Sequence, residues 1–481
     1  MWLRVIKNVV SVLALVLTAP LLTATPAEAD PPDFGPCPFD GAECAEVSVP
    51  LDPAEPGGEQ ISIAISRVRA SGPPAEYRGA LLVNPGGPGG SGLEYSVSKG
   101  AKLPERVRRS YDVIGFDPRG VGRSAPLDCR ELGGLFDHPS PEPVPAGARQ
   151  EREHLDRLDR MAEDCLRHNP DAEWMSTTNT ARDMDRIRRA LGEPKLNFLG
   201  VSYGSYLGAT YANEFPGRVG RMVLDSVVGP DRWHDFDVRQ AHAMLRQREV
   251  LLGWIADHPE LGLGRTHRQV RQAYDRARAD LAAAPARGTF GPAEFDNRVY
   301  KTLSRTERWR PFAEALGAYV RTGDASGLAP ELPESDPESR NYEAALRTVK
   351  CADSTRPTRA EVIGDIRELR RADRHPILTG LEATTCAFWP APAEPARFGH
   401  PTMPPVLLTQ AEQDPTTPYD GAERMQAELP GSRMISAREA YSHGLFASQR
   451  IACVDDAAAA YLVDGELPER DVRCQGPGLP E

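Results

Sequence analysis

KLNFLGVSYGSYLGATYANE, residues 195–214, contains a G-x-S-x-G pentapeptide that runs from Gly200 to Gly204. The apolar residues before Gly200 favour a short strand, and the run from Ser205 to Glu214 favours a helix. In a sharp strand-to-helix turn of this kind, glycines flank the serine because a Cβ would collide with neighbouring backbone. Such a turn lifts the hydroxyl out of the sheet, so Ser202 is a candidate nucleophile. The pentapeptide alone is a weak signal, and its surroundings must support it.

Strand-like and helix-like segments alternate on both sides of this stretch. Residues 79–84 (GALLVN) and 111–116 (YDVIGF) are short apolar runs, as expected for strands buried on both faces. Residues 180–191 predict a helix because Met184, Ile187 and Leu191 share one face, and Gly192 is placed to end it. Further strands are expected at 221–228, 405–410 and 433–436, and a last helix includes 457–462. The pattern predicts an α/β fold, a mostly parallel sheet flanked by helices.

The sequence pattern changes between about 230 and 397, where helical stretches rich in Arg, Ala and Glu replace the alternation of strand-like and helix-like segments. This composition is typical of a helical lid inserted into a sheet domain, with loops where a substrate enters. The predicted organisation is a signal peptide over 1–29, a first core segment over 30–229, a helical lid insertion over 230–397 and a C-terminal core segment over 398–481.

A serine nucleophile needs a general base, and the base needs an acid that fixes its tautomer. In this architecture the chain order is serine, acid, histidine. Asp414 follows the strand expected at 405–410, and His443 follows the next one, whereas no other histidine follows a strand beyond Asp414. The rival acid is Asp420, but its setting in YDGA favours a helix N-cap. Ser202, Asp414 and His443 are therefore the predicted catalytic residues.

Two backbone amides must receive the developing oxyanion. One is expected from Tyr203, which follows the nucleophile, and the other from Gly87 in the glycine-rich loop NPGGPGGSG at 84–92. A phosphate-binding loop is the alternative, but the segment lacks a Gly-Lys-Ser/Thr ending and the G-x-G-x-x-G pattern. The segment DPRGVGRS at 117–124 is expected to form a tight turn that pins neighbouring loops rather than a catalytic element.

The N-terminus predicts export. Arg4 and Lys7 precede a short apolar run over 9–22, and Ala27-Glu28-Ala29 forms a small-x-small cleavage site, which favours a secretory signal over a membrane anchor. We expect a secreted protein cleaved near Ala29. The formal net charge of −12 argues against nucleic acid and against stable membrane association.

Eight cysteines in an exported chain predict disulfides rather than metal ligands, since neither a C-x-x-C pair nor H-E-x-x-H occurs. Other connectivities stay open, because spacing alone cannot fix the pairing. The simplest pairing is local: Cys37 with Cys44, Cys129 with Cys165, Cys351 with Cys386, and Cys453 with Cys474.

Several motifs together resemble the secreted tripeptidyl aminopeptidases of high-GC Gram-positive bacteria, which belong with the proline iminopeptidases among α/β-hydrolase serine peptidases. They are NPGGPGGSG at 84–92, FDPRGVGRS at 116–124, TTNTARDMDRIRRALGE at 177–193, GVSYGSYLGATYA at 200–212, DPTTP at 414–418 and CVDDAAAAYLVDGELP at 453–468. Proline iminopeptidases carry a histidine before their Gly-Gly-Pro-Gly loop. Asn84-Pro85 stands there in this chain, which favours the tripeptidyl group.

The resemblance implies an α/β-hydrolase fold with Ser202, Asp414 and His443 as the triad, and Ser442 is a small departure from the family pattern. It implies a serine exopeptidase that releases short peptides, such as tripeptides, from substrates with a free N-terminus, without a metal or cofactor. Lid acids would bind the substrate amine, but the sequence does not identify them. The alternatives are an esterase or amidase for small molecules with the same triad, and a non-catalytic binding protein of the same fold.

Overall fold

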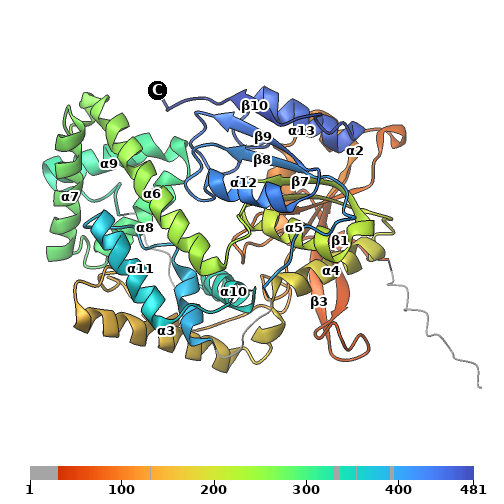
Figure 1. The fold of residues 1–481 in the computed structure, drawn as a ribbon, viewed down its shortest axis with the longest axis horizontal. Helices are drawn as coiled ribbons and strands as arrows, with labels where there is room; N and C mark the ends of the chain where they lie inside the picture. Colours follow the sequence, from red (N-terminus) through yellow and green to blue (C-terminus); the bar gives the residue numbers. More distant parts are fainter. Residues whose placement is uncertain (1–30, 131, 330–335, 354, 390–394) are drawn as a thin grey trace, which may run out of the picture.

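The computed structural model describes residues 31–130, 132–329, 336–353, 355–389 and 395–481. The predicted signal peptide, residues 1–29, lies outside these ranges. A ten-stranded sheet runs through one half of the molecule, and a group of helices forms the other half (Figure 1). No helix in the described ranges combines the length and the apolar character needed to cross a bilayer.

The sheet has the strand order β1-β2-β3-β5-β4-β6-β7-β8-β9-β10. All neighbours from β5 to β10 pair in parallel, and β1, β2 and β3 add an antiparallel edge. The strands are β1 (Gly35–Pro36), β2 (Glu43–Pro50), β3 (Gln60–Val68), β4 (Ala80–Asn84), β5 (Asp112–Phe116), β6 (Leu196–Val201), β7 (Val219–Asp225), β8 (Leu407–Ala411), β9 (Arg433–Arg438) and β10 (Val472–Gln475). The predicted α/β fold with a mostly parallel sheet is confirmed.

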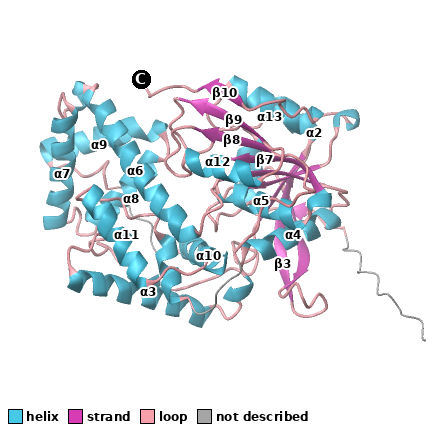
Figure 2. Ribbon diagram, in the orientation of Figure 1, coloured by secondary structure: helices cyan, strands magenta, loops and turns pink. Residues whose placement is uncertain are grey.

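Some helices lie against the sheet, and the others form the group beside it (Figure 2). The helices are α1 (Leu93–Gly100), α2 (Glu105–Ser110), α3 (Ala148–His168), α4 (Thr177–Ala190), α5 (Tyr203–Glu214), α6 (Trp233–Ala256), α7 (His267–Ala283), α8 (Pro292–Leu303), α9 (Trp309–Thr322), α10 (Pro337–Asp353), α11 (Arg359–Ala372), α12 (Tyr419–Glu428) and α13 (Ala452–Asp464). The helices α6 to α11 lie between β7 and β8 in the chain, and we call them the helical body.

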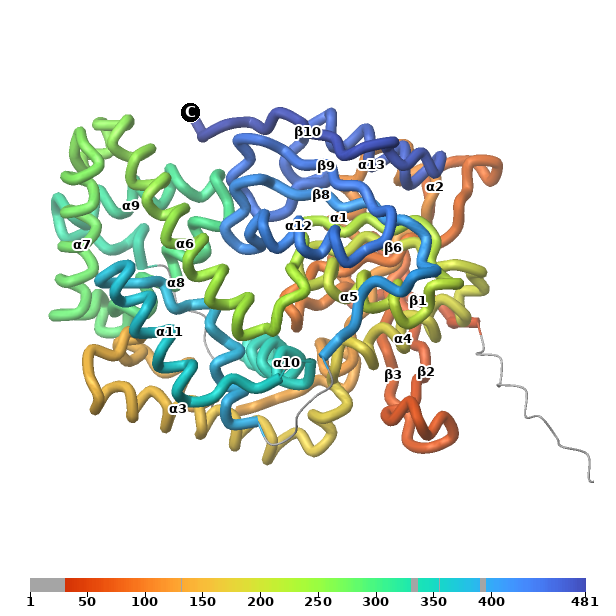
Figure 3. Tube along the Cα trace, viewed as in Figure 1, coloured from red at the N-terminus to blue at the C-terminus, as the bar shows by residue number. Residues whose placement is uncertain are grey.

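Both faces of the central strands are buried, which explains their unbroken apolar runs. Along β4 and β6, Leu82 and Phe198 pack into a core with α4 and α5, whereas Leu81 and Leu199 pack on the opposite face with α13. The helical body has a core of its own, built from α6 to α9. Helix α3 lies well before the helical body in the sequence, yet it packs against this body (Figure 3). Glu151 of α3 pairs with Arg367 of α11.

The expected strand at 221–228 is wrong at its ends, because β7 covers Val219–Asp225. Ser226 takes a positive φ of 50°, which breaks the extended chain directly after Asp225. The other predicted strands and helices match observed elements within a few residues, and Gly192 ends α4 with a φ of 73° as expected.

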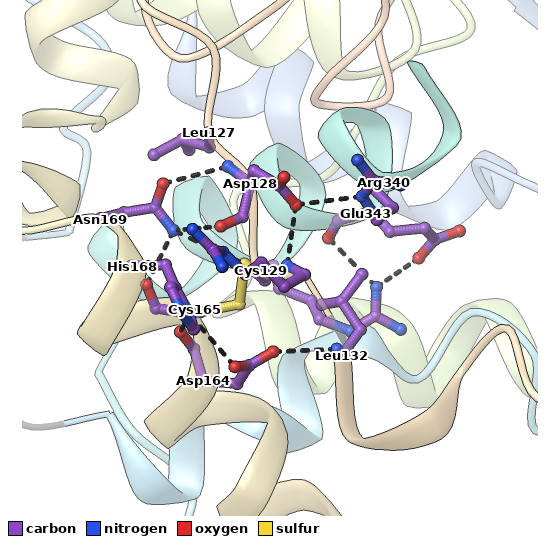
Figure 4. Close-up of a disulfide and its surroundings, with 12 residues drawn as sticks. Leu127, Asp128, Cys129, Leu132, Asp164, Cys165, His168, Asn169, Arg340 and Glu343 are labelled. Carbon is purple, nitrogen blue, oxygen red and sulfur yellow. Dashed lines mark hydrogen bonds and ion pairs between the residues drawn. A yellow bond between two sulfur atoms is a disulfide. The ribbon is translucent and has the colours of Figure 1, made fainter. Parts of the chain in front are cut away.

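All four disulfides follow the local pairing, Cys37–Cys44, Cys129–Cys165, Cys351–Cys386 and Cys453–Cys474. Figure 4 shows Cys129–Cys165, which joins the loop after β5 to α3. Beside it, Asn169 accepts a hydrogen bond from the Asp128 amide and donates one to the Asp128 carbonyl. The bridge and these bonds hold a long loop onto α3.

Candidate active site

Ser202 lies in the turn between β6 and α5, with φ 60° and ψ −126°. This conformation is strained for a residue with a side chain. The turn closes because the flanking positions are glycines: a Cβ on Gly200 would lie 2.1 Å from the carbonyl oxygen of Gly204. A Cβ on Gly204 would lie 3.0 Å from the carbonyl oxygen of Asn84. The G-x-S-x-G segment thus has the sharp geometry expected from its sequence.

The glycine-rich loop after β4 lies against this turn. A Cβ on Gly86 would lie 2.9 Å from the Cβ of Ser202 and 3.1 Å from the amide nitrogen of Tyr203. The Gly86 amide donates to Asn84 Oδ1 at 3.0 Å, so it is already occupied. The amides of Gly87 and Tyr203 have no hydrogen bond within the described part of the chain. Both predicted oxyanion donors therefore remain available to a ligand.

Asp414 and His443 are in direct contact. His443 Nδ1 lies 2.9 Å from Asp414 Oδ2 and 3.1 Å from Oδ1. Asp414 also accepts the amides of Thr416 and Thr417 and the hydroxyl of Thr417. Burial acts to raise the pKa of Asp414, but the charge of His443 and these hydrogen bonds outweigh it and lower the pKa below its usual value. Asp414 is thus an ionised carboxylate that fixes the orientation of the imidazole.

The rival acid Asp420 lies elsewhere. It is exposed in the first turn of α12, where its carboxylate pairs with Arg424 at 2.7 Å and Arg239 at 3.5 Å. The expected N-cap role is wrong, because Pro418 is the N-cap residue of α12 and Asp420 lies two positions inside the helix. An acid in the first turn interacts favourably with the helix dipole, which accounts for its place.

Asp225 and Ser226, at the end of β7, connect the two halves of the site. The carbonyl of Asp225 accepts the Ser202 amide at 2.8 Å, and its buried carboxylate accepts the amides of Leu445 and Phe446. The Ser226 hydroxyl accepts the Gly444 amide at 2.7 Å. These two residues therefore fix the loop that carries His443 relative to the serine turn.

Sequence reasoning missed Asp225 and Ser226, although a signal existed. Asp225 is an acid inside an otherwise apolar strand, RMVLDSVV, and a buried charge requires partners. The segment 117–124 has the pinning role expected for it. Asp117 accepts the Ser91 hydroxyl and the Gly92 amide, and Arg119 forms a buried ion pair with Asp183 at 2.7 Å.

No hydrogen bond joins the Ser202 hydroxyl to His443 or to another group in the described residues. Both residues belong to segments that Asp225 holds, and catalytic hydrogen bonds often tighten only when a substrate is bound. The arrangement supplies a strained serine, an oriented imidazole, an ionised acid and two unused amides, which are the parts that acyl transfer requires.

The helical body reaches this site through Tyr342 and Tyr300. The ring of Tyr342 would lie 3.5 Å from a Cβ on Gly87, and Tyr300 donates to Gln240, whose side chain donates to the Thr416 carbonyl beside Asp414. Next to these residues lies a cavity of about 270 Å³ whose lining includes Glu343 and Glu382. A Cβ on Gly380, which lines this cavity, would lie 3.2 Å from the ring of Tyr300 and 2.5 Å from Gln240 Oε1, so the cavity borders these two residues.

A family model described as the alpha/beta hydrolase fold matches residues 79–446. The chain is an alpha/beta hydrolase. The tripeptidyl aminopeptidase of Streptomyces lividans is 37% identical to it over 451 residues, which cover 90% of this chain and 83% of the relative. Serine protease Hip1 of Mycobacterium tuberculosis is 30% identical over 469 residues, covering 90% and 87%. These relatives and the fold establish this alpha/beta hydrolase as a serine hydrolase.

Two further proteins are similar to this alpha/beta hydrolase. Carboxylesterase B of Mycobacterium tuberculosis is 31% identical over 461 residues, covering 90% of this chain and 86% of the relative. The crystal structure of the proline iminopeptidase of Mycobacterium smegmatis is 14% identical, with a TM-score of 0.36, and the match covers 87% of this chain and 98% of that one. The sequence relatives carry the family assignment.

Proposed function

We propose that this alpha/beta hydrolase is a secreted serine peptidase that releases short peptides, tripeptides above all, from substrates with a free N-terminus. The observation that supports it most directly is the 2.9 Å contact between Asp414 and His443, on a loop tied through Asp225 to the strained turn of Ser202. The similarity to a tripeptidyl aminopeptidase over 90% of the chain supports the peptide substrate. The disulfides are compatible with an oxidising compartment, and export is part of the proposal.

In the proposed mechanism, His443 takes the proton of Ser202 while the hydroxyl oxygen attacks the scissile carbonyl carbon. Asp414 stabilises the imidazolium, and the amides of Gly87 and Tyr203 receive the oxyanion. His443 then gives its proton to the departing amine, and water hydrolyses the acyl-enzyme with His443 again as the base. None of these steps calls on a metal or cofactor.

We further propose that the cavity beside Tyr300 receives the substrate ammonium group, with Glu382 as its main partner. Glu382 and Asp237 share Lys350, whose Nζ lies 2.8 Å and 2.7 Å from their carboxylates. Burial acts to raise the pKa of Glu382, but the charge of Lys350 outweighs it and lowers the pKa. Glu382 therefore stays ionised, whereas Glu343, which also lines the cavity, pairs with Arg347. In this role the helical body is a lid that selects peptides by their free amine.

Peptidyl nitroanilides with one, two or three residues, each with a free or an acetylated N-terminus, test this function. We expect the free tripeptidyl substrate to be cleaved fastest, and acetylation to lower kcat/KM by about 100-fold, the scale of one buried charge interaction. Glu382→Gln should raise KM for the free substrate and leave the acetylated one little changed. Equal rates for free and acetylated substrates would refute the exopeptidase.

An esterase acting on small molecules is the second candidate, because carboxylesterase B is similar over the same 90% of the chain. A short-chain nitrophenyl ester should then be hydrolysed with a higher kcat/KM than any peptide. Labelling of the protein by a fluorophosphonate, and its loss in Ser202→Ala, decides between both enzymes and a non-catalytic protein. Ser62→Ala, in β3, is the matched serine control.

A further inference from the structure

A second cavity, of about 220 Å³, has His443 in its lining. The lining includes Pro85 of the glycine-rich loop, Val201 directly before Ser202, and His443 with Gly444. This cavity shares no lining residue with the one that contains Glu382. The serine turn therefore has a separate cavity on the histidine side.

The lining of this second cavity is cationic. Lys99, Lys102 and Arg305 contribute to it, and no carboxylate does. Arg305 approaches the catalytic loop closely, since its Nη2 would lie 3.9 Å from a Cβ on Gly444. Neither Arg305 nor Lys102 forms an ion pair with any residue in the described ranges. Two cations beside the catalytic histidine thus have no internal counter-charge of their own.

Lys99 is different, because it has a structural role. It is 3% exposed, and its Nζ donates to the Phe446 carbonyl and the Ser448 hydroxyl. Burial, together with the charges of Arg305 and Lys102, lowers the pKa of Lys99 to about 8, although the carboxylate of Asp225 acts the other way. The cations repel one another, and an incoming anion would relieve this repulsion.

The position of the cavity indicates which part of a substrate would enter it. In the proposed mechanism His443 hands its proton to the departing amine, so the leaving group must lie beside the imidazole. The cavity that Lys102 and Arg305 line also has His443 in its lining, whereas the lining of the cavity with Glu382 includes no residue of the serine turn, the glycine-rich loop or the histidine loop. The departing fragment therefore faces the cations.

We propose that this cavity is a leaving-group subsite that takes a carboxylate, with Arg305 and Lys102 as its partners. This inference rests on the proposed hydrolase mechanism and deepens it. The carboxylate has two possible sources: the C-terminus of a peptide that ends directly after the scissile bond, or an acidic side chain on the first residue released. Arginine suits either source because its planar fork matches a carboxylate.

The test compares kcat/KM for substrates that differ only in the leaving group. One pair is a tetrapeptide with a C-terminal acid or amide, cleaved after its third residue. The other pair is a pentapeptide amide with Glu or Gln as the fourth residue. We expect at least one acidic member to be preferred by about tenfold, the scale of one charge-assisted hydrogen bond, and the pair that shows it identifies the source.

Arg305→Gln and Lys102→Gln should bring that ratio towards one. Lys301→Gln is the control, because Lys301 is an exposed residue of α8 outside the cavity. This substitution removes the same charge and should keep the wild-type ratio. The proposal is overturned if the wild-type protein cleaves both members of each pair equally. It is also overturned if the preference survives in Arg305→Gln and Lys102→Gln.

A small ester separates this inference from the proposed peptide specificity. 4-Acetoxybenzoate and 4-acetoxybenzamide differ by one carboxylate on the leaving phenol and need no amine subsite. If the protein cleaves no peptide, the exopeptidase proposal fails, and the ester pair still tests the cavity. A preference for the benzoate that disappears in Arg305→Gln supports the subsite, whereas equal rates refute it.

Discussion

At the scale of single residues, Asp225 holds together segments that are far apart in the sequence. Its carbonyl receives the Ser202 amide, and its carboxylate receives two amides of the loop after His443. Burial raises the pKa of Asp225, while Lys99 and the hydrogen bonds from that loop act to lower it. A buried carboxylate with several donors gives a fixed geometry, which acyl transfer needs because small displacements of reacting groups are costly.

Asp414→Asn should lower kcat by about 10⁴-fold with little change in KM, because the amide no longer fixes the productive tautomer of His443. Steady-state kinetics with the best peptidyl nitroanilide measures both parameters. Asp420→Asn is the matched control and should stay within twofold of wild type, since Asp420 pairs only with surface arginines. A wild-type kcat in Asp414→Asn would remove this residue from the mechanism.

The contact between Asp414 and His443 could be anticipated because each follows an expected strand, and the ends of parallel strands meet at one edge of a sheet. Asp225 could not be assigned, because its role depends on a loop more than 200 positions away in the chain. The same reason hides Glu382 and Arg305. Their places follow from how helices pack, and no local spacing specifies that packing.

At the scale of elements, the helical body is hydrogen-bonded to the loop that carries His443. The His443 amide donates to the Ser304 carbonyl at 2.9 Å, and the Ser442 hydroxyl accepts the Thr306 amide at 2.9 Å and contacts the Thr306 hydroxyl at 3.0 Å. Ser304 and Thr306 lie where α8 ends. The Ser442 side chain and the His443 amide thus both tie the histidine loop to the helices.

Ser442→Ala should lower kcat about fivefold and leave KM within twofold, because the loss of about 1 kcal/mol of hydrogen bonding loosens His443 rather than the substrate. Thr322→Val, which removes an exposed hydroxyl in α9, is the control for a general effect on the helices. Thermal unfolding of both variants checks that they are folded at the assay temperature. An unchanged kcat in Ser442→Ala would show that this tie has no catalytic role.

Asp353, at the end of α10, joins the helical body to the sheet domain. Its environment makes the stability of the folded protein depend on pH. Its carboxylate accepts the amide and hydroxyl of Thr177 at the start of α4, and burial raises its pKa to about 7. An unfolded aspartate titrates near pH 4. The folded protein therefore holds more protons between about pH 4 and pH 7, and this group lowers stability as pH rises through that window.

Asp353→Asn keeps an acceptor for the Thr177 amide and removes the ionisation. We expect the fall in unfolding midpoint between pH 5 and pH 8 to become shallower, as measured by urea unfolding at several pH values. Asp324→Asn is the control, because hydrogen bonds from Ser326 lower the pKa of this exposed aspartate and its titration lies below the window. Identical slopes for Asp353→Asn and wild type would contradict the assignment.

At the scale of the whole molecule, the α/β fold and its local disulfides could be predicted because they depend on period and spacing. The β2–β3 hairpin and β10 were missed. The tertiary positions of α3 and the helical body could not be predicted from the sequence either, because an amphipathic helix can pack against several different partners. Helix α3 belongs in sequence to the first core segment but packs on η7 (Glu382–Phe388) and pairs with Arg367.

The disulfides should differ in their contribution to stability according to the chain they enclose. Cys351–Cys386 spans 35 residues and Cys37–Cys44 spans 7. Loop-closure entropy gives about 4 kcal/mol for the first and about 2 kcal/mol for the second. Double alanine variants of each pair, compared by urea unfolding, should show this order. The reverse order would mean that closing the loop is not the main source of their stabilisation.

The cations in the cavity beside His443 would also give the active centre a direction. Arg305 and Lys102 line the cavity that also contains His443, and Glu382 lines the other cavity, near Tyr300. A short peptide carries a carboxylate at one end and an ammonium group at the other, so the forward orientation would place the carboxylate beside these cations and the backward orientation would place the ammonium group there. The enzyme would then discriminate between the forward and the reversed orientation of a bound peptide before any bond is broken. High ionic strength would weaken this discrimination.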